Sequence, residues 1–165
     1  MLEIERKLVE LERKLARVTD ELELTRITAS IAPSVDSLSA DIAARLWAED
    51  GVYDVPGVGC WTGHDELRAF FSGEQLRAAL SKGAAHVLSS PRIVIDGNIA
   101  AGTCYSFLCR KSEKGVEVLR LAANRIEFRR TNEGWRISKR TVLDIDGSEG
   151  TRTLLGATFS QSNGV

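Results

Sequence analysis

The chain has few cysteines, few histidines and no excess of charge of either sign. Its 165 residues include three cysteines and two histidines, and 22 basic residues nearly balance 23 acidic ones, for a formal net charge of -1. A chain without a basic excess gives no reason to expect a nucleic acid or an anionic membrane as partner. The cysteines are odd in number and lack the spacing of metal ligands. No apolar run is long enough for a signal peptide or a membrane span, so we expect a cytoplasmic protein that acts on small molecules.

The first 22 residues predict an amphipathic helix. Glu3 and Lys7, and then Glu10 and Lys14, stand at the favourable i,i+4 spacing. Apolar residues recur at steps of four and three, and these are Ile4, Leu8, Leu11, Leu15, Val18 and Leu22. About two and a half heptads are too short to establish a coiled coil, so two interpretations stay open. The helix packs on its own domain, or it forms a seam between subunits of a homo-oligomer, a dimer or trimer.

Residues 23–147 are expected to form one α+β domain, helical first and rich in strands later. A Gly-rich stretch broken by Pro56 predicts a strand and a loop. From residue 84 onward apolar residues alternate with a period of two, and "DGN", "EKG" and "NEG" mark turns. These turns predict hairpins, and therefore a curved antiparallel sheet in which consecutive strands are neighbours. We expect a C-terminal tail at residues 148–165, whose end, "GATFSQSNGV", is polar, small and loose.

Several longer stretches follow one another in a characteristic order. They are "VD" after the first helix, "LWAEDGVYDVPGVGCWTGHDELRAFF", a histidine that opens the sheet, "RIVIDGNIAAGTCY" and "NRIEFRRTNEGWRISKR". This series, which spans residues 8–147, resembles the SnoaL-like branch of the ketosteroid isomerase and nuclear transport factor 2-like superfamily. The resemblance implies a cone-shaped α+β barrel, with a strongly curved antiparallel sheet wrapped around helices and a deep pocket inside.

In lyases of this branch, an aspartate in the first helical region orients a histidine at the start of the sheet, and the histidine removes a proton from the substrate. Asp36 of "SVD" and His86 of "AAHVLSSP" stand at the matching positions. An imidazole takes up and returns a proton near neutral pH, and a carboxylate on its other nitrogen fixes the tautomer and stabilises the cation. The resemblance therefore implies a lyase or isomerase, of the dehydratase or dehydrohalogenase type, that needs no cofactor and no metal.

Three further residues match positions that contact the substrate in such enzymes. Tyr53 of "GVYDV" matches an aromatic residue that lies against the substrate. Asn124 stands eleven residues before Trp135, as a substrate-binding asparagine does in a dehydratase of this branch. Arg140 of "SKR" corresponds to an arginine that can hold an electronegative leaving group. The resemblance implies that these three residues bind a hydrophobic small-molecule substrate.

Other features of the same sequence depart from this pattern. Val35 and Ile31 stand where the dehydratases have tyrosines, and the predicted sheet holds no second histidine. Asp36 could instead cap the helix that follows it, and His86 could be a structural residue. The same fold also occurs in non-catalytic binding and assembly modules, and the fold does not decide between them and an enzyme. The discriminating feature is a carboxylate aimed at a buried imidazole, which a binding module does not need.

Overall fold

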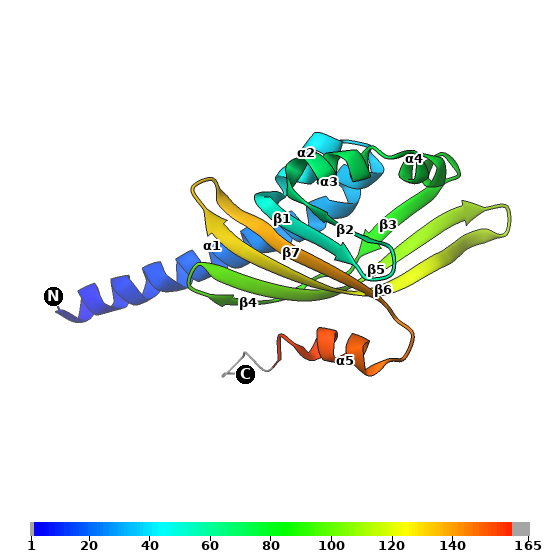
Figure 1. Ribbon diagram of the computed structural model, residues 1–165. Helices are drawn as coiled ribbons and strands as arrows, with labels where there is room; N and C mark the ends of the chain where they lie inside the picture. Colours follow the sequence, from blue (N-terminus) through cyan, green and yellow to red (C-terminus); the bar gives the residue numbers. More distant parts are fainter. Residues whose placement is uncertain (1, 160–165) are drawn as a thin grey trace.

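The computed structural model describes residues 2–159, and its first element is one long helix, α1 (Leu2–Asp36) (Figure 1). The boundary expected at residue 22 does not interrupt this helix. Pro33 lies inside the last turn, where its missing N–H removes one helical hydrogen bond. From Leu24 onward one side of the helix is buried, and this tertiary packing overrides the local cost of the proline. The predicted N-terminal helix and the first part of the body are therefore one continuous element.

Short helices and the first strand pair follow α1. Their bounds are α2 (Ala40–Arg45), β1 (Trp47–Val55), β2 (Gly59–Thr62), α3 (Gly63–Phe71) and α4 (Glu74–Ser81). The Gly-rich stretch around Pro56 is the turn between β1 and β2, which pair antiparallel. Asp36 does not cap α2, because the N-cap residue of that helix is Ser39.

The second half of the body consists of strands, as the period of two predicts. They are β3 (Ala84–Leu88), β4 (Arg92–Asp96), β5 (Ile99–Ser112), β6 (Gly115–Thr131) and β7 (Gly134–Asp144). Hairpins at "DGN", "EKG" and "NEG" join β4 to β5, β5 to β6 and β6 to β7. Each predicted turn is thus confirmed.

The seven strands form one strongly curved sheet in the order β2-β1-β7-β6-β5-β3, with β4 also paired to β5. Among the described strands, only the pair β1 and β7 runs parallel. The prediction of an antiparallel sheet needs this correction. The connection between β1 and β7 passes through five other strands and two helices, and such a long connection does not impose the antiparallel direction that a tight hairpin does.

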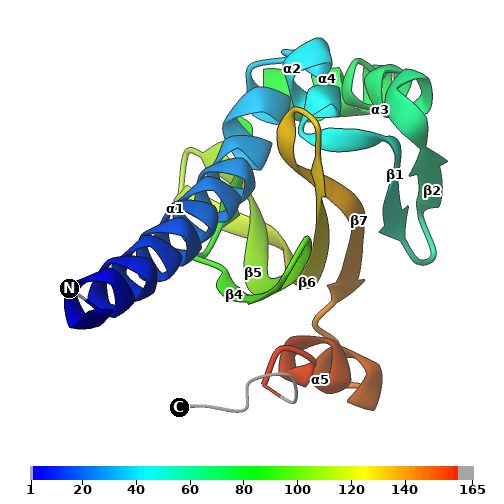
Figure 2. The ribbon, with the colours of Figure 1, turned by 90° about the vertical axis from the view of Figure 1, so that its left-hand side faces the viewer.

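Alternation along β6 separates the two faces of the sheet. Asn124, Ile126 and Phe128 are buried, whereas Arg125 and Glu127, which lie between them, are not. The second half of α1 and the helices α2–α4 cover the inner face, so that the sheet and helices form a cone (Figures 1 and 2). The core and the site described below lie between these layers.

A short helix, α5 (Glu149–Gly156), packs on the outer face of the sheet against β5 and β6 (Figure 1). The hydroxyls of Thr103 on β5 and Thr158 after α5 are buried and 3.1 Å apart. The predicted C-terminal tail at 148–165 therefore begins with a helix that packs on the sheet. The helix α5 begins here because Ser148 is its N-cap: the Ser148 hydroxyl accepts a hydrogen bond from the backbone N–H of Thr151. Residues 160–165 of the predicted tail lie outside the described residues.

The middle of α1 is fastened to the turn between β6 and β7. Asp20 accepts a hydrogen bond from the indole Nε1 of Trp135 at 3.0 Å and forms an ion pair with Arg130 at 2.6 Å. Glu23 accepts a hydrogen bond from the backbone N–H of Trp135 at 3.0 Å. Burial by itself would raise the pKa of the Asp20 carboxyl, but the hydrogen bonds from Arg130 and Trp135 outweigh it and leave this pKa below its ordinary value of 3.8.

Replacing Asp20 by asparagine should destabilise the protein by about 1 kcal/mol at pH 7, because the ion pair with Arg130 is lost. Ionised Asp20 stabilises the fold above pH 3.8, and this contribution disappears as the pH falls through the lower folded-state pKa. Urea unfolding at pH 7 and pH 3 should therefore show a difference between wild type and Asp20→Asn that shrinks at pH 3. Asp65→Asn removes an exposed carboxylate and serves as the control. An Asp20→Asn effect of equal size at both pH values would contradict this account.

Candidate active site

Asp36 and His86 make a two-point contact across 50 residues of chain. The Oδ1 atom of Asp36 lies 2.6 Å from Nδ1 of His86, and Oδ2 accepts a hydrogen bond from the His86 backbone N–H at 2.7 Å. A carboxylate accepts hydrogen bonds, so Nδ1 carries the proton in this geometry. The neutral ring then has its lone pair on Nε2. Within residues 2–159, Nε2 has no hydrogen-bond partner in the protein.

The local fold explains why these two residues meet. Asp36 is the last residue of α1, and His86 is the middle residue of β3, which packs against α1. Both side chains are partly buried, with exposed fractions of 22% for Asp36 and 31% for His86. Because both carboxylate oxygens are used by His86, Asp36 is not available to cap a helix. The sequence-based pairing of Asp36 with His86 is thus matched by their contact.

His86 lines an interior cavity of about 120 Å³ on the inner side of the cone. The cavity is mostly apolar. Its polar side chains are His86 and the two cations Arg120 and Arg140, and Tyr53 and Trp61 add a hydroxyl and an indole N–H. The other lining residues are Ile31, Ala32, Val35, Tyr53, Val55, Val58, Trp61, Phe70, Phe71, Leu76 and Leu88. An apolar cavity with a few convergent polar groups is the usual form of a small-molecule site.

Four aromatic side chains form one wall of this cavity. The ring centroids of Trp61 and Phe70 are 3.9 Å apart, and Tyr53 lies 5.6 Å from Trp61 and 5.7 Å from Phe70. Phe71 adjoins Tyr53 and Phe70. The wall offers ring faces and edges to a flat apolar group. Tyr53 therefore lines the cavity, and its contact with a substrate stays a prediction.

Arg140 is buried at the cavity, with an exposed fraction of 6%, and its guanidinium carbon lies 5.1 Å from the centre of the Tyr53 ring. Its Nε and Nη2 donate to the side-chain oxygen of Asn124 at 3.0 and 2.8 Å. Within the described part of the chain, no carboxylate forms an ion pair with Arg140. A buried charge without a counter-ion attracts a negative group. The cavity therefore favours an anionic or electronegative substituent near Arg140.

Asn124 lies behind Arg140 and does not line the cavity. Its amide nitrogen donates to the Ser106 hydroxyl at 2.8 Å, so both ends of the side chain are occupied. The contact of Asn124 with a substrate stays a prediction, and what the structure shows is that its side-chain oxygen holds Arg140. Cys104, paired with Asn124 across the strands, is a buried neighbour: burial raises the pKa of its thiol, and the Arg140 charge offsets this only in part.

The cavity is also lined by Phe70, Phe71 and Leu76, which the sequence alone does not mark as site residues. The adjacent aromatics of "LRAFF" are a weak signal, because helical periodicity alone assigns them to the core. Ile31 and Val35, noted as departures from the dehydratase pattern, line the cavity as apolar groups. Arg120 is held at the cavity by an ion pair with Asp144.

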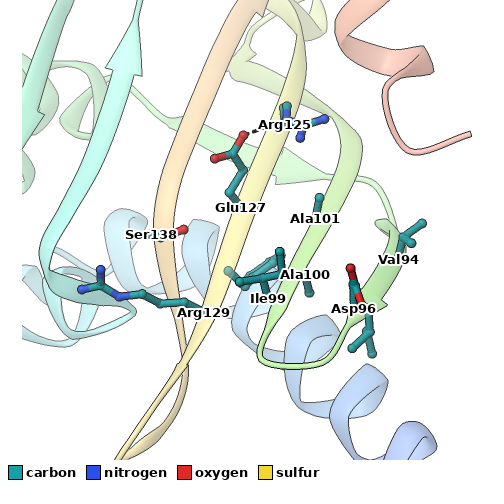
Figure 3. Close-up of a pocket in the computed structure, with 11 residues that line it drawn as sticks. Val94, Asp96, Ile99, Ala100, Ala101, Arg125, Glu127, Arg129 and Ser138 are labelled. Atoms are coloured by element: carbon teal, nitrogen blue, oxygen red, sulfur yellow. Dashed lines mark hydrogen bonds and ion pairs between the residues drawn. The ribbon is translucent and has the colours of Figure 1, made fainter. Parts of the chain in front are cut away.

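A larger hollow of about 710 Å³ lies on the outer face of the sheet (Figure 3). Arg125 and Glu127 form an ion pair there (Figure 3), and the Arg125 Nε atom lies 2.9 Å from Oε1 of Glu127. Arg129, also in this hollow, is paired with Asp50. These cations are already neutralised, and neither histidine lines the hollow. The aspartate–histidine pair therefore belongs to the inner cavity and not to this hollow.

The second histidine, His64, lies outside the inner cavity. Its Nε2 is 3.0 Å from the carbonyl oxygen of Trp47. A carbonyl only accepts hydrogen bonds, so Nε2 carries the proton of His64. His64 and His86 are thus held in opposite tautomers. Among residues 2–159, no three His, Cys, Asp or Glu side chains are arranged to hold a metal ion, and no helix is long and apolar enough to cross a lipid bilayer.

A curved sheet around helices, with an aspartate–histidine pair at an apolar interior cavity, defines a class of cone-shaped α+β proteins. A family model described as the SnoaL-like domain matches residues 16–141. The chain belongs to this family, within the NTF2-like superfamily. No curated protein matches the sequence.

Solved structures share this fold. An NTF2-like protein with a cystatin-like fold from Novosphingobium aromaticivorans is 34% identical, with a TM-score of 0.87 over 90% of this chain and 96% of that one. A protein of unknown function from Mycobacterium tuberculosis is 17% identical, with a TM-score of 0.67 over 82% and 75% of the two chains. A protein from Catenulispora acidiphila, solved in complex with S-DNPA, is 16% identical, with a TM-score of 0.64 over 78% and 94%. The last two likenesses concern the fold alone.

Changing Asn124 to aspartate should abolish the anion preference of the cavity. The new carboxylate is nearly isosteric and pairs with Arg140, so the positive charge that attracts a ligand is neutralised. We expect benzoate to bind the wild type and to bind Asn124→Asp at least ~10-fold more weakly, because a difference of about 1.4 kcal/mol is a factor of ten. Binding can be followed by the fluorescence of Trp61 in the cavity wall.

The matched control is Ser138→Asp, which adds the same charge in the outer hollow. This variant should bind benzoate as the wild type does. Equal affinity of wild type and Asn124→Asp would show that Arg140 does not hold the anion.

Proposed function

We propose that the protein is a cofactor-independent lyase or isomerase in which His86 removes a proton from a carbon atom of a hydrophobic small molecule. The observation that carries this proposal is the two-point contact of the Asp36 carboxylate with the ring and the backbone of His86. That contact leaves the lone pair of Nε2 as the base. A carboxylate on the opposite ring nitrogen stabilises the imidazolium that forms when the proton is taken.

The reaction begins with cleavage of a C–H bond, whose proton moves to Nε2 of His86. In an elimination, the electron pair of this bond forms a C=C bond, and a neighbouring halide or hydroxyl group leaves with its own bonding pair. In an isomerisation, the pair moves into a conjugated carbonyl and the proton returns to another carbon. Either path develops negative charge away from His86. Arg140, which is buried and has no counter-ion among residues 2–159, stabilises that charge.

The cavity selects for a flat, apolar substrate with one electronegative end. Tyr53, Trp61 and Phe70 offer aromatic surface, and the guanidinium of Arg140 lies beside Tyr53. The cyclic ketones that carry an acidic C–H bond and a β-hydroxyl or β-chloro group have this combination. The apolar lining lowers the local dielectric constant, which strengthens the electrostatic attraction of Arg140 for the developing charge.

The test is proton exchange in D₂O with a panel of such ketones, followed by NMR. Exchange reports C–H cleavage in which the proton returns to carbon, and the loss of substrate signals with the growth of alkene signals reports C–H cleavage in which a group leaves. For each substrate that the wild type turns over, His86→Gln should lower the rate by roughly 10²–10⁴-fold, the usual contribution of a general base. Asp36→Asn should cause a loss of similar size, because its amide NH₂ donates to Nδ1 and forces the proton onto Nε2.

His64→Gln is the matched control, since His64 lies outside the cavity and should be dispensable for exchange. Binding of panel members with neither exchange nor elimination in the wild type would favour a non-catalytic binding module of the same fold. Full activity of either His86→Gln or Asp36→Asn would remove the pair from the mechanism.

A further inference from the structure

Six apolar side chains form an exposed row along the first half of α1, which we call the α1 stripe. Their exposed fractions run from 47% to 73%. The members are Ile4, Leu8, Leu11, Leu15, Val18 and Leu22. Because the steps between them alternate between four and three, all six lie on one side of the helix. An exposed apolar row of this size marks a surface that another protein covers.

The α1 stripe lies on a part of the helix that leaves the body of the protein. Residues 2–19 are all exposed, and Asp20, bonded to Trp135, is the first residue that is not. Figures 1 and 2 show this half of α1 extending beyond the sheet. The interpretation that this half of α1 packs on its own domain is therefore not supported, and its apolar row is open to contact with another chain.

We propose that the α1 stripe packs against the same stripe of two further copies of this chain, as a parallel, in-register coiled coil. The stripe alternates between positions a and d of a heptad repeat, which is the pattern that supercoiled helices bury. The identical spacing in each copy makes the surface complementary to itself. The clamp of Asp20 and Glu23 on Trp135 fixes the helix where it leaves the body.

The charges beside the α1 stripe favour the parallel direction. In the heptad that the stripe defines, Glu5 and Glu12 take position e, and Lys7 and Lys14 take position g. In a parallel coiled coil, a g residue faces the e residue of the following heptad in the next chain. Lys7 therefore faces Glu12 of the neighbouring copy, and the arrangement brings no like charges together. Ion pairs within each helix, such as Lys7 with Glu3, compete with these contacts between chains. They are exposed, so they contribute little stability and compete only weakly.

An antiparallel pair with full overlap of the stripe is less favourable. It brings Lys14 opposite Lys14 and Glu12 opposite Glu12 of the second copy. It also pairs Lys7 of each copy with Glu21 of the other. The two attractive contacts between lysine and glutamate are then offset by the two repulsive contacts between like charges. Like charges placed directly against each other disfavour an arrangement and help to select the alternative.

The residues at a and d favour three chains over two. Leucine occupies position a, and β-branched residues occupy two of the d positions. Leucine at a with a β-branched residue at d shifts parallel coiled coils from two strands toward three or more. The leucines are Leu8, Leu15 and Leu22, and the β-branched residues are Ile4 and Val18. Three is the smallest number of chains that satisfies this preference.

Light scattering of the full chain tests the assembly. The wild type should have the mass of three chains, and Leu15→Asp, which puts a charge at a central a position, should have the mass of one. Val9→Asp is the control, because Val9 is equally exposed but lies off the stripe. It should keep the mass of three chains. A wild type of one or two chains, or a Leu15→Asp variant that keeps three, would overturn the proposal.

Cross-linking tests the direction of the helices. In a Cys60→Ser background, which removes the exposed native thiol, Ile4→Cys should form a disulfide between chains on oxidation. Glu10→Cys, which lies on the far side of the helix from the seam, should not. The absence of a cross-link at position 4 would rule out a parallel, in-register seam.

Discussion

The site depends on the two hydrogen bonds by which Asp36 holds both the ring and the backbone of His86. They join the last residue of α1 to the middle of β3, so one contact fixes the helix end, the strand and the orientation of the imidazole together. A ring held only through Nδ1 can still rotate or shift with its strand. With the backbone amide bound to the same carboxylate, the ring and strand are placed as one unit.

The opposite side of the cavity is built by a second chain of hydrogen bonds. Ser106 accepts from Asn124, and Asn124 accepts from Arg140, whose guanidinium lies beside the Tyr53 ring. These residues come from β5, β6, β7 and β1, which are consecutive neighbours in the sheet. A base at one wall and a cation at another suit a reaction that takes a proton at one end of a molecule and develops negative charge at the other.

Features set by local chemistry could be predicted from the sequence, and features set by strand register could not. The period of two and the turn residues predict the hairpins of β4 to β7, and the order of motifs predicts the cone. The parallel pairing of β1 with β7 arises between distant segments and leaves no local signal. The contact of Asn124 with Arg140 also depends on strand register. The two residues lie on the neighbouring strands β6 and β7 but are not directly opposite each other. Pro33 suggests that the first helix ends before it, but packing against the body keeps the helix intact as far as Asp36. The apolar pattern at the start of this helix also does not say whether that side faces its own domain or another chain.

The most direct test of the central claim is the ¹⁵N NMR spectrum of the two histidines at a pH where both are neutral. The account predicts opposite tautomers in the wild type, with the proton on Nδ1 of His86 and on Nε2 of His64. In Asp36→Asn, the His86 proton should move to Nε2 while His64 is unchanged. A wild-type His86 that carries its proton on Nε2, or one whose tautomer is indifferent to Asp36→Asn, would contradict the assignment of His86 as a base held ready by Asp36.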